Sequence, residues 1–209
     1  MIDFLYRRNI KSDGPTLPNE HVYSILVLLE NASLSEVVRS TLSEMTKIKD
    51  LFLIVIRSIE VLENMKLVSS LIQFISNLCY GTGKFRKMLA MEPPVEFLTT
   101  IENILEMTSK TQLTIEDKSK IDWDFESKRS LLKGATLGFV GNLCVEVKLR
   151  QVIASDMGGV LSRVYIMLQS DVNSKPFDWV EGVTKELAVL INCSLEDKAV
   201  KFFAEKDIV

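Results

Sequence analysis

Four asparagine residues end similar apolar, helix-like stretches and divide the chain into comparable segments. They are Asn31, Asn77, Asn142 and Asn192, at successive intervals of 46, 65 and 50 residues. The two most similar phrases are Phe-Ile-Ser-Asn-Leu-Cys around Asn77 and Phe-Val-Gly-Asn-Leu-Cys around Asn142. Self-similarity at a period of about 40–50 residues is typical of stacked helical repeats, which offer surfaces for binding rather than closed pockets. The spacing therefore predicts an α-helical array.

Apolar residues recur at helical spacing within each segment, and this recurrence predicts where the helices lie. The predicted helices are 22–29, 35–45, 50–63, 65–79, 84–90, 95–107, 130–145, 149–154, 160–168, 179–195 and 198–205. Gly158-Gly159 is expected to form a sharp turn. The charged segment 109–128 has few aliphatic residues, so we predict an inserted loop there, which explains the interval of 65 residues.

The whole chain, 1–209, is expected to form a single array. The approximate repeats are 22–45, 46–83, 84–147, 148–197 and a partial 198–209. The last residues read as the first helix of a repeat that is not completed, which predicts a fragment or shortened form of a larger repeat protein. An uncapped terminal repeat exposes apolar residues such as Phe202 and Phe203, so self-association through the terminal repeats is expected.

Composition and charge restrict the classes of partner and compartment. The 209-residue chain has a net charge of −3 and a pI near 5.4, whereas nucleic-acid binding usually requires a basic face. The longest uncharged stretch, 134–145, is too short to span a bilayer, and no secretory signal is visible. Three cysteines are too few for a disulfide framework. We expect a cytoplasmic protein, with a nuclear location left open, that binds neither nucleic acid nor membrane.

No group of residues in the sequence suggests catalysis or metal binding. The only histidine, His21, is expected on the surface. Cys79, Cys144 and Cys193 fall in different segments, whereas a tetrahedral zinc site requires four clustered ligands. We expect these thiols to be small core residues in a reducing compartment. The predicted protein is therefore not an enzyme, and it has no catalytic residue, no metal site and no cofactor.

The repeated unit resembles the armadillo repeat. Residues 74–78 and 139–143 are similar to the end of that family's third helix, and residues 153–161 are similar to its glycine-containing turn. The segments around Asn31 and Asn192 match less closely. The resemblance covers residues 22–209 and implies a right-handed α-solenoid of about three to four armadillo-like repeats, whose third helices line a concave groove. HEAT repeats, built from two helices, are the nearest alternative.

The resemblance suggests one function for the asparagine row, and helix chemistry suggests another. In armadillo proteins the equivalent asparagine often hydrogen-bonds the backbone of an extended peptide, because an amide has both a donor and an acceptor. The alternative is that each amide caps its own helix or bonds the neighbouring repeat. The residues four positions earlier are Val27, Gln73, Gly138 and Ala188, none of them aromatic, which argues against a nuclear-localisation-signal receptor.

The sequence thus predicts a scaffold or adaptor that binds a protein or an extended peptide along a concave helical groove. Trp123 and Phe125, within the charged segment, are a second candidate for partner docking, with a solvated loop as the alternative. A chaperone-like assembly factor is the alternative function, because armadillo arrays also follow tetratricopeptide repeats in co-chaperones.

Overall fold

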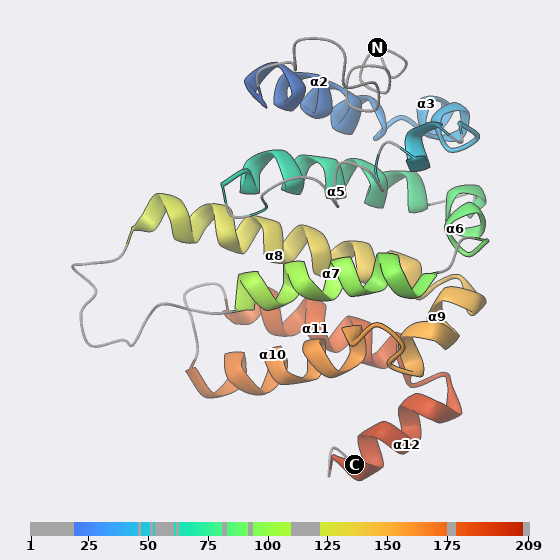
Figure 1. Ribbon diagram of the computed structural model, residues 1–209, viewed down its shortest axis with the longest axis vertical. Coiled ribbons are helices and arrows are strands. Elements are labelled where there is room, and N and C mark those ends of the chain that lie inside the picture. The colour runs from blue at the N-terminus through green and yellow to red at the C-terminus, as the bar shows by residue number, and fades with distance from the viewer. Residues whose placement is uncertain are drawn as a thin grey trace. The chain divides into compact units, whose positions relative to one another are not determined.

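The structure is a computed structural model that describes residues 19–45, 47–50, 52, 61, 63–80, 83–91, 94–109, 122–174 and 179–206. The described residues form helices and no strand, which confirms the predicted all-α class. The chain divides into two compact units, an N-terminal unit, Met1–Glu92, and a C-terminal unit, Pro93–Val209. Figure 1 shows the helices of both units in chain order.

The N-terminal unit is organised around one strongly apolar helix, α5. The helices are α2 (Asn19–Ala32), α3 (Glu36–Leu42), α5 (Met65–Cys79) and α6 (Lys84–Leu89). Helix α5 contacts the other three, and its residues at three- and four-residue intervals are buried, including Leu71, Phe74, Ile75 and Leu78. Its bounds agree with the predicted helix 65–79, whereas most of the predicted helix 50–63 lies outside the described residues.

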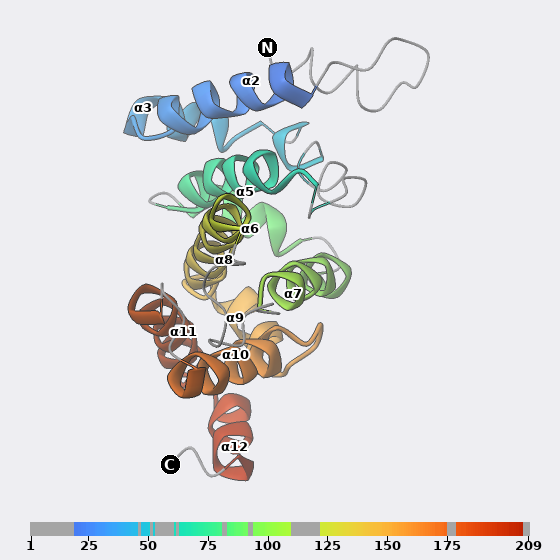
Figure 2. The same cartoon turned by 90° about the vertical axis from the view of Figure 1, so that its left-hand side faces the viewer.

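The C-terminal unit consists of two stacked helix pairs with short helices at one end. Its helices are α7 (Pro94–Ser109), α8 (Trp123–Leu143), α9 (Val147–Ala154), α10 (Val160–Ser174), α11 (Trp179–Cys193) and α12 (Asp197–Glu205). Helix α7 contacts α8 and α10, and α11 contacts α8 and α10, so the pair α7–α8 stacks on the pair α10–α11 (Figure 2). The buried apolar core between these helices includes Leu98, Ile101, Leu132, Phe139, Leu161, Val164 and Val189.

The predicted glycine turn joins α9 to α10. Gly158 has a φ of +103°, and a Cβ atom there would lie 2.9 Å from Leu98 Cβ. Both the backbone conformation and the close approach to α7 therefore require glycine. Asp156 Oδ1 accepts a hydrogen bond of 3.0 Å from the Ser162 backbone N–H in the first turn of α10.

Both bounds of the predicted loop 109–128 differ from the structure. Helix α7 continues to Ser109, and α8 begins at Trp123. Asp122 starts α8 as its N-cap, with Oδ1 accepting hydrogen bonds of 3.1 Å from the backbone N–H groups of Asp124 and Phe125. Residues 110–121 lie outside the described residues. Buried Glu126 and Arg129 pair at 2.8 Å, so this part of the charged segment belongs to the core.

The terminal aromatic residues are not the exposed surface that we expected. Phe203 is buried, and the Phe202 ring packs edge-on against Tyr165 of α10 with ring centroids 6.0 Å apart. The expectation that these two side chains are exposed is therefore wrong, and self-association through the terminal repeats stays a prediction. Helix α12 uses them to pack within the C-terminal unit.

An arginine in each of three short helices bonds the end of the helix before it. Arg39 of α3 donates to the Ser33 carbonyl at 3.4 Å, Arg86 of α6 donates to the Cys79 carbonyl, and Arg150 of α9 donates to the Cys144 carbonyl at 3.2 Å. The last carbonyl groups of a helix lack intrahelical partners, so each arginine satisfies a group that would otherwise need water. We call these contacts the arginine clips. The sequence analysis did not predict them.

Replacing Arg150 by alanine is expected to lower the free energy of unfolding of the C-terminal unit by about 1–2 kcal/mol. The substitution removes the clip to Cys144 and the ion pair of 2.7 Å with Glu196, the residue before α12. Urea unfolding followed by tryptophan fluorescence measures this unit alone, because Trp123 and Trp179 are the only tryptophans. Exposed Lys148, on the same helix, is the matched control. An equal effect of Lys148→Ala would contradict the assignment.

Candidate functional site

Asn77 hydrogen-bonds a neighbouring helix of its own unit. Its Nδ2 lies 3.0 Å from Ser33 Oγ and 3.4 Å from the Glu30 carbonyl oxygen, both at the end of α2. Its Oδ1 accepts a hydrogen bond of 3.2 Å from Gln73 Nε2, one turn earlier on α5. The amide therefore joins α5 to α2, which is what the alternative hypothesis for the asparagine row predicts.

Asn31 bonds only within its own helix among the residues that the structure describes. Its Nδ2 donates to the Val27 carbonyl at 2.9 Å, and the side chain is exposed at the end of α2. The interaction is local, as is common for asparagine near helix ends. The N-terminal unit thus holds one amide that bonds a neighbouring helix, Asn77, and one exposed amide that bonds its own helix, Asn31.

Asn142 and Asn192 lie at the ends of α8 and α11, two helices that contact each other. Both side chains are half-buried. No hydrogen bond joins Asn192 to another described residue. The C-terminal unit therefore places the two equivalent amides on neighbouring helices.

Small residues precede both amides on these helices. Gly138 lies one turn before Asn142, and exposed Ala188 lies one turn before Asn192. A Cβ atom added at Gly138 or at Gly141 would meet nothing within 4 Å. These two glycines therefore do not mediate the close helix contact that often explains glycine in a helix. They leave the α8 backbone accessible beside Asn142.

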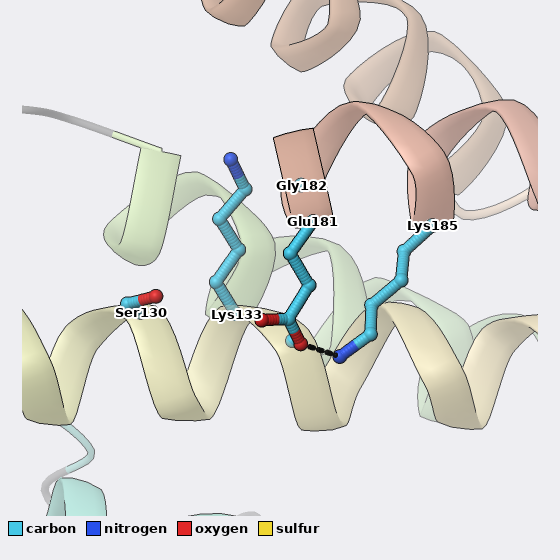
Figure 3. A pocket seen from close by; sticks show the side chains of 6 residues that line it. Ser130, Lys133, Glu181, Gly182 and Lys185 are labelled. Carbon is cyan, nitrogen blue, oxygen red and sulfur yellow. Dashed lines mark hydrogen bonds and ion pairs between the residues drawn. The ribbon is translucent and has the colours of Figure 1, made fainter. Parts of the chain in front are cut away.

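A shallow notch lies between α8 and α11, farther toward the start of both helices. It is lined by Ser130, Lys133, Gly134, Glu181, Gly182 and Lys185. Figure 3 shows the side chains of Glu181 and Lys185 meeting beside α8, where Lys185 Nζ donates to Glu181 Oε1 at 2.6 Å. This exposed pair gives the edge of the α8–α11 surface both a negative and a positive group.

A buried charged cluster joins three helices of the C-terminal unit. Lys133 of α8 is 2% exposed, and its Nζ donates to Asp171 Oδ2 of α10 and lies 3.2 Å from Glu186 Oε1 of α11. Glu186 has no exposed surface. A Cβ atom at Gly182 would lie 2.8 Å from Asp171 Oδ2, so glycine allows α11 to approach the pair closely.

The surroundings of Glu186 favour its protonated form. Burial raises the pKa of Glu186 from 4.5 to about 7, the Lys133 ammonium opposes this rise, and Asp171 adds to it. The cluster holds one ammonium and two carboxyl groups that are almost fully buried, so its clearest role is to lock α8, α10 and α11 together. Sequence analysis missed it, although Glu186 occupies the apolar face of α11 between Gly182 and Val189.

The cysteines are buried, as predicted. Cys144 Sγ and Cys193 Sγ lie 3.8 Å apart, so residues from different predicted repeats are in contact. The hydrogen bond with Cys193 and burial raise the pKa of Cys144 well above its usual value, which keeps the thiol protonated and unreactive. Among the described residues, no three His, Cys, Asp or Glu side chains form a group that could hold a metal ion.

His21 is exposed, as predicted. Trp123 is exposed and Phe125 is half-buried, and both lie in the first turn of α8 rather than in a loop. The prediction that these two residues lie in a loop is therefore wrong.

Comparison of the chain with protein families, curated proteins and solved structures gives no significant match. None of the described helices is both long and apolar enough to cross a membrane.

Proposed function

We propose that the protein is a non-catalytic scaffold or adaptor that binds an extended protein segment along α8 and α11. One observation carries the proposal: Asn142 and Asn192 lie at the ends of contacting helices, each one turn after Gly138 or Ala188. Because these neighbours are small, a peptide backbone can approach the amides without displacing side chains. Each amide has a donor and an acceptor that match one peptide unit.

The proposal includes an armadillo-like, right-handed solenoid as the architecture. Two observations support it. The C-terminal unit contains a short helix, α9, followed by the longer helices α10 and α11, which is the order of helices in an armadillo repeat. The arginine clips recur at Arg39, Arg86 and Arg150, each eight or nine residues after an asparagine of the row. Recurrence of the same contact supports a common repeat.

A selected peptide allows the surface to be tested. Peptides that bind the immobilised full chain would be selected from a random display library, and one would be measured by fluorescence anisotropy. Asn142→Ala combined with Asn192→Ala is expected to weaken binding by at least about tenfold, corresponding to about 1.4 kcal/mol. Asn31→Ala, at an exposed amide bonded within its own helix, is the matched control.

Melting temperatures separate the two hypotheses for the asparagine row. Asn77→Ala is expected to lower the melting temperature, because it removes the bonds to Glu30 and Ser33. Asn192→Ala, at an amide with no hydrogen bond to another described residue, is expected to melt near wild type while binding weakly. Unchanged binding in that variant, or a failure to select any peptide, would overturn the proposal.

A further inference from the structure

Two of the three cysteines lie in direct contact at the ends of neighbouring helices. Cys144 follows the last residue of α8 and Cys193 ends α11, and both side chains are buried. Their sulfur atoms are 3.8 Å apart, although 49 residues separate them in the chain. A disulfide bond is about 2.05 Å long, so each sulfur has to move by only about 0.9 Å to form one. The pair is therefore within reach of a covalent bond.

A chain of hydrogen bonds holds the two helix ends together beside the sulfur atoms. Arg150 of α9 donates to the Cys144 carbonyl at 3.2 Å and pairs with Glu196 at 2.7 Å. The Glu196 backbone N–H in turn donates to the Cys193 carbonyl at 2.9 Å. One ion pair thus links the backbone groups of both cysteines. Breaking it removes one of the connections between the end of α8 and the end of α11.

We propose that Cys144 and Cys193 form a redox-sensitive lock, in which a hydroperoxide oxidises the two thiols to a disulfide that joins α8 to α11. A cross-link between residues so far apart in the chain restricts the unfolded state strongly. The oxidised C-terminal unit is therefore more stable than the reduced one, and a thiol reductant reverses the lock. The lock does not depend on the proposed peptide surface, because thiol state and stability are properties of the free chain.

The closed unit protects the pair, and opening of the helix ends makes it reactive. The hydrogen bond with Cys193 and burial raise the pKa of Cys144, whereas the Arg150 guanidinium lowers it. When the end of α11 moves away, that hydrogen bond is lost, water enters, and Arg150 loses the neutralising charge of Glu196. The Cys144 thiolate, which is the reactive form, is then favoured. Helix α12, which follows this end, buries only two of its nine residues, and sparsely buried terminal elements open at low free-energy cost.

The oxidation has two balanced steps. The Cys144 thiolate attacks one oxygen of hydrogen peroxide, the O–O bond breaks, and the departing hydroxide takes up the thiol proton as water, leaving a sulfenic acid. The Cys193 thiol then attacks the sulfenic sulfur, the S–O bond breaks, and a second water leaves as the S–S bond forms. In total the two thiols lose two electrons and two protons, and the peroxide is reduced to two waters.

Thiol counting and mass spectrometry of the full chain test the disulfide. After a small molar excess of hydrogen peroxide, the free thiols counted in denaturant are expected to fall from three to one, with a mass loss of two hydrogen atoms. Digestion is expected to give a linked pair of peptides that contain Cys144 and Cys193. Cys79, buried in the other unit, is the internal control and stays free. Three free thiols under conditions that oxidise a dithiol peptide, or a disulfide that includes Cys79, would overturn the proposal.

Melting followed by tryptophan fluorescence tests whether the disulfide stabilises the C-terminal unit. The oxidised chain is expected to melt at least about 5 °C above the reduced chain, and dithiothreitol is expected to reverse the shift. Cys193→Ala is expected to abolish the shift, whereas Cys79→Ala, the matched control, is expected to retain it. A disulfide that forms without raising the melting temperature would contradict the lock.

The rate of oxidation tests the gating by the helix ends. Glu196→Gln removes the ion pair and leaves the Arg150 charge in place, so this variant is expected to oxidise at least about threefold faster than the wild type. Glu205→Gln, at an exposed residue of α12, is the matched control. Equal rates in the two variants would show that opening at the Arg150–Glu196 pair does not control access to the thiols.

Discussion

Replacing Lys133 by methionine is expected to lower the free energy of unfolding of the C-terminal unit by about 3–5 kcal/mol. The methionine fills a similar volume, but it leaves the carboxyl groups of Asp171 and Glu186 buried without a cation. Glu186 has no exposed surface, and neither of its carboxyl oxygens accepts a hydrogen bond from another described residue. Urea unfolding followed by tryptophan fluorescence measures the loss as a lower midpoint with an unchanged slope.

Lys128→Met is the matched control for this prediction. Lys128 lies on the same helix, and its ion pair with Asp124 is on the surface, where Asp124 is 70% exposed. Exposed pairs of this kind contribute about 0–1 kcal/mol. If Lys133→Met cost no more than Lys128→Met, the buried cluster would not be the link between α8, α10 and α11 that we infer.

The C-terminal unit is also expected to lose stability as the pH rises through 7. The pKa of Glu186 is about 7 in the folded chain, above the ordinary value of 4.5 that applies when the chain unfolds. Between these values the folded state holds a proton that the unfolded state releases, so unfolding becomes more favourable as the pH rises. The stabilisation is full below about pH 4.5, and nearly all of it, about 3 kcal/mol, is lost by about pH 8.

Glu186→Gln should flatten this part of the stability profile, because the amide does not titrate. Unfolding midpoints in urea at about pH 5, 6, 7 and 8 test the prediction, with the variant gaining on the wild type toward high pH. Glu181→Gln is the matched control, since Glu181 is on the same helix with a side chain that is 70% exposed. Parallel profiles for the wild type and Glu186→Gln would contradict the assigned titration.

Local patterns in the sequence predicted much of the helical order. The bounds of α5 could be predicted because its apolar residues recur at intervals of three and four, the spacing of one face of a helix. The turn at Gly158 could be predicted because only glycine readily adopts its positive φ. Both features depend on residues close together in the chain, so no tertiary information was needed.

Features that depend on distant partners could not be predicted in the same way. The start of α8 was missed because its charged residues resemble a solvated loop, although Glu126 and Arg129 pair inside the core. Lys133 meets Asp171, which is 38 residues away, and nothing in the spacing of single residues indicates that contact.

The asparagine row shows, within one motif, that tertiary contacts cannot be predicted from local sequence. The interval between the four residues predicted a repeat, but it could not show what each amide contacts. Asn77 bonds α2, whereas Asn192 bonds no other described residue. Equivalent positions in a repeat share a backbone location, and their neighbours then decide whether the side chain contributes to packing or to binding.

The arginine clips also bear on how the helices form together. The carbonyl group at the end of α8 receives its partner only when α9 has docked, because Arg150 lies on α9. The same dependence links α5 to α6 through Arg86. Completion of one helix is thus coupled to the arrival of the next, which gives nearest-neighbour cooperativity that runs along the chain. Replacing one of these arginines should therefore destabilise both the helix that carries it and the preceding helix whose end it bonds.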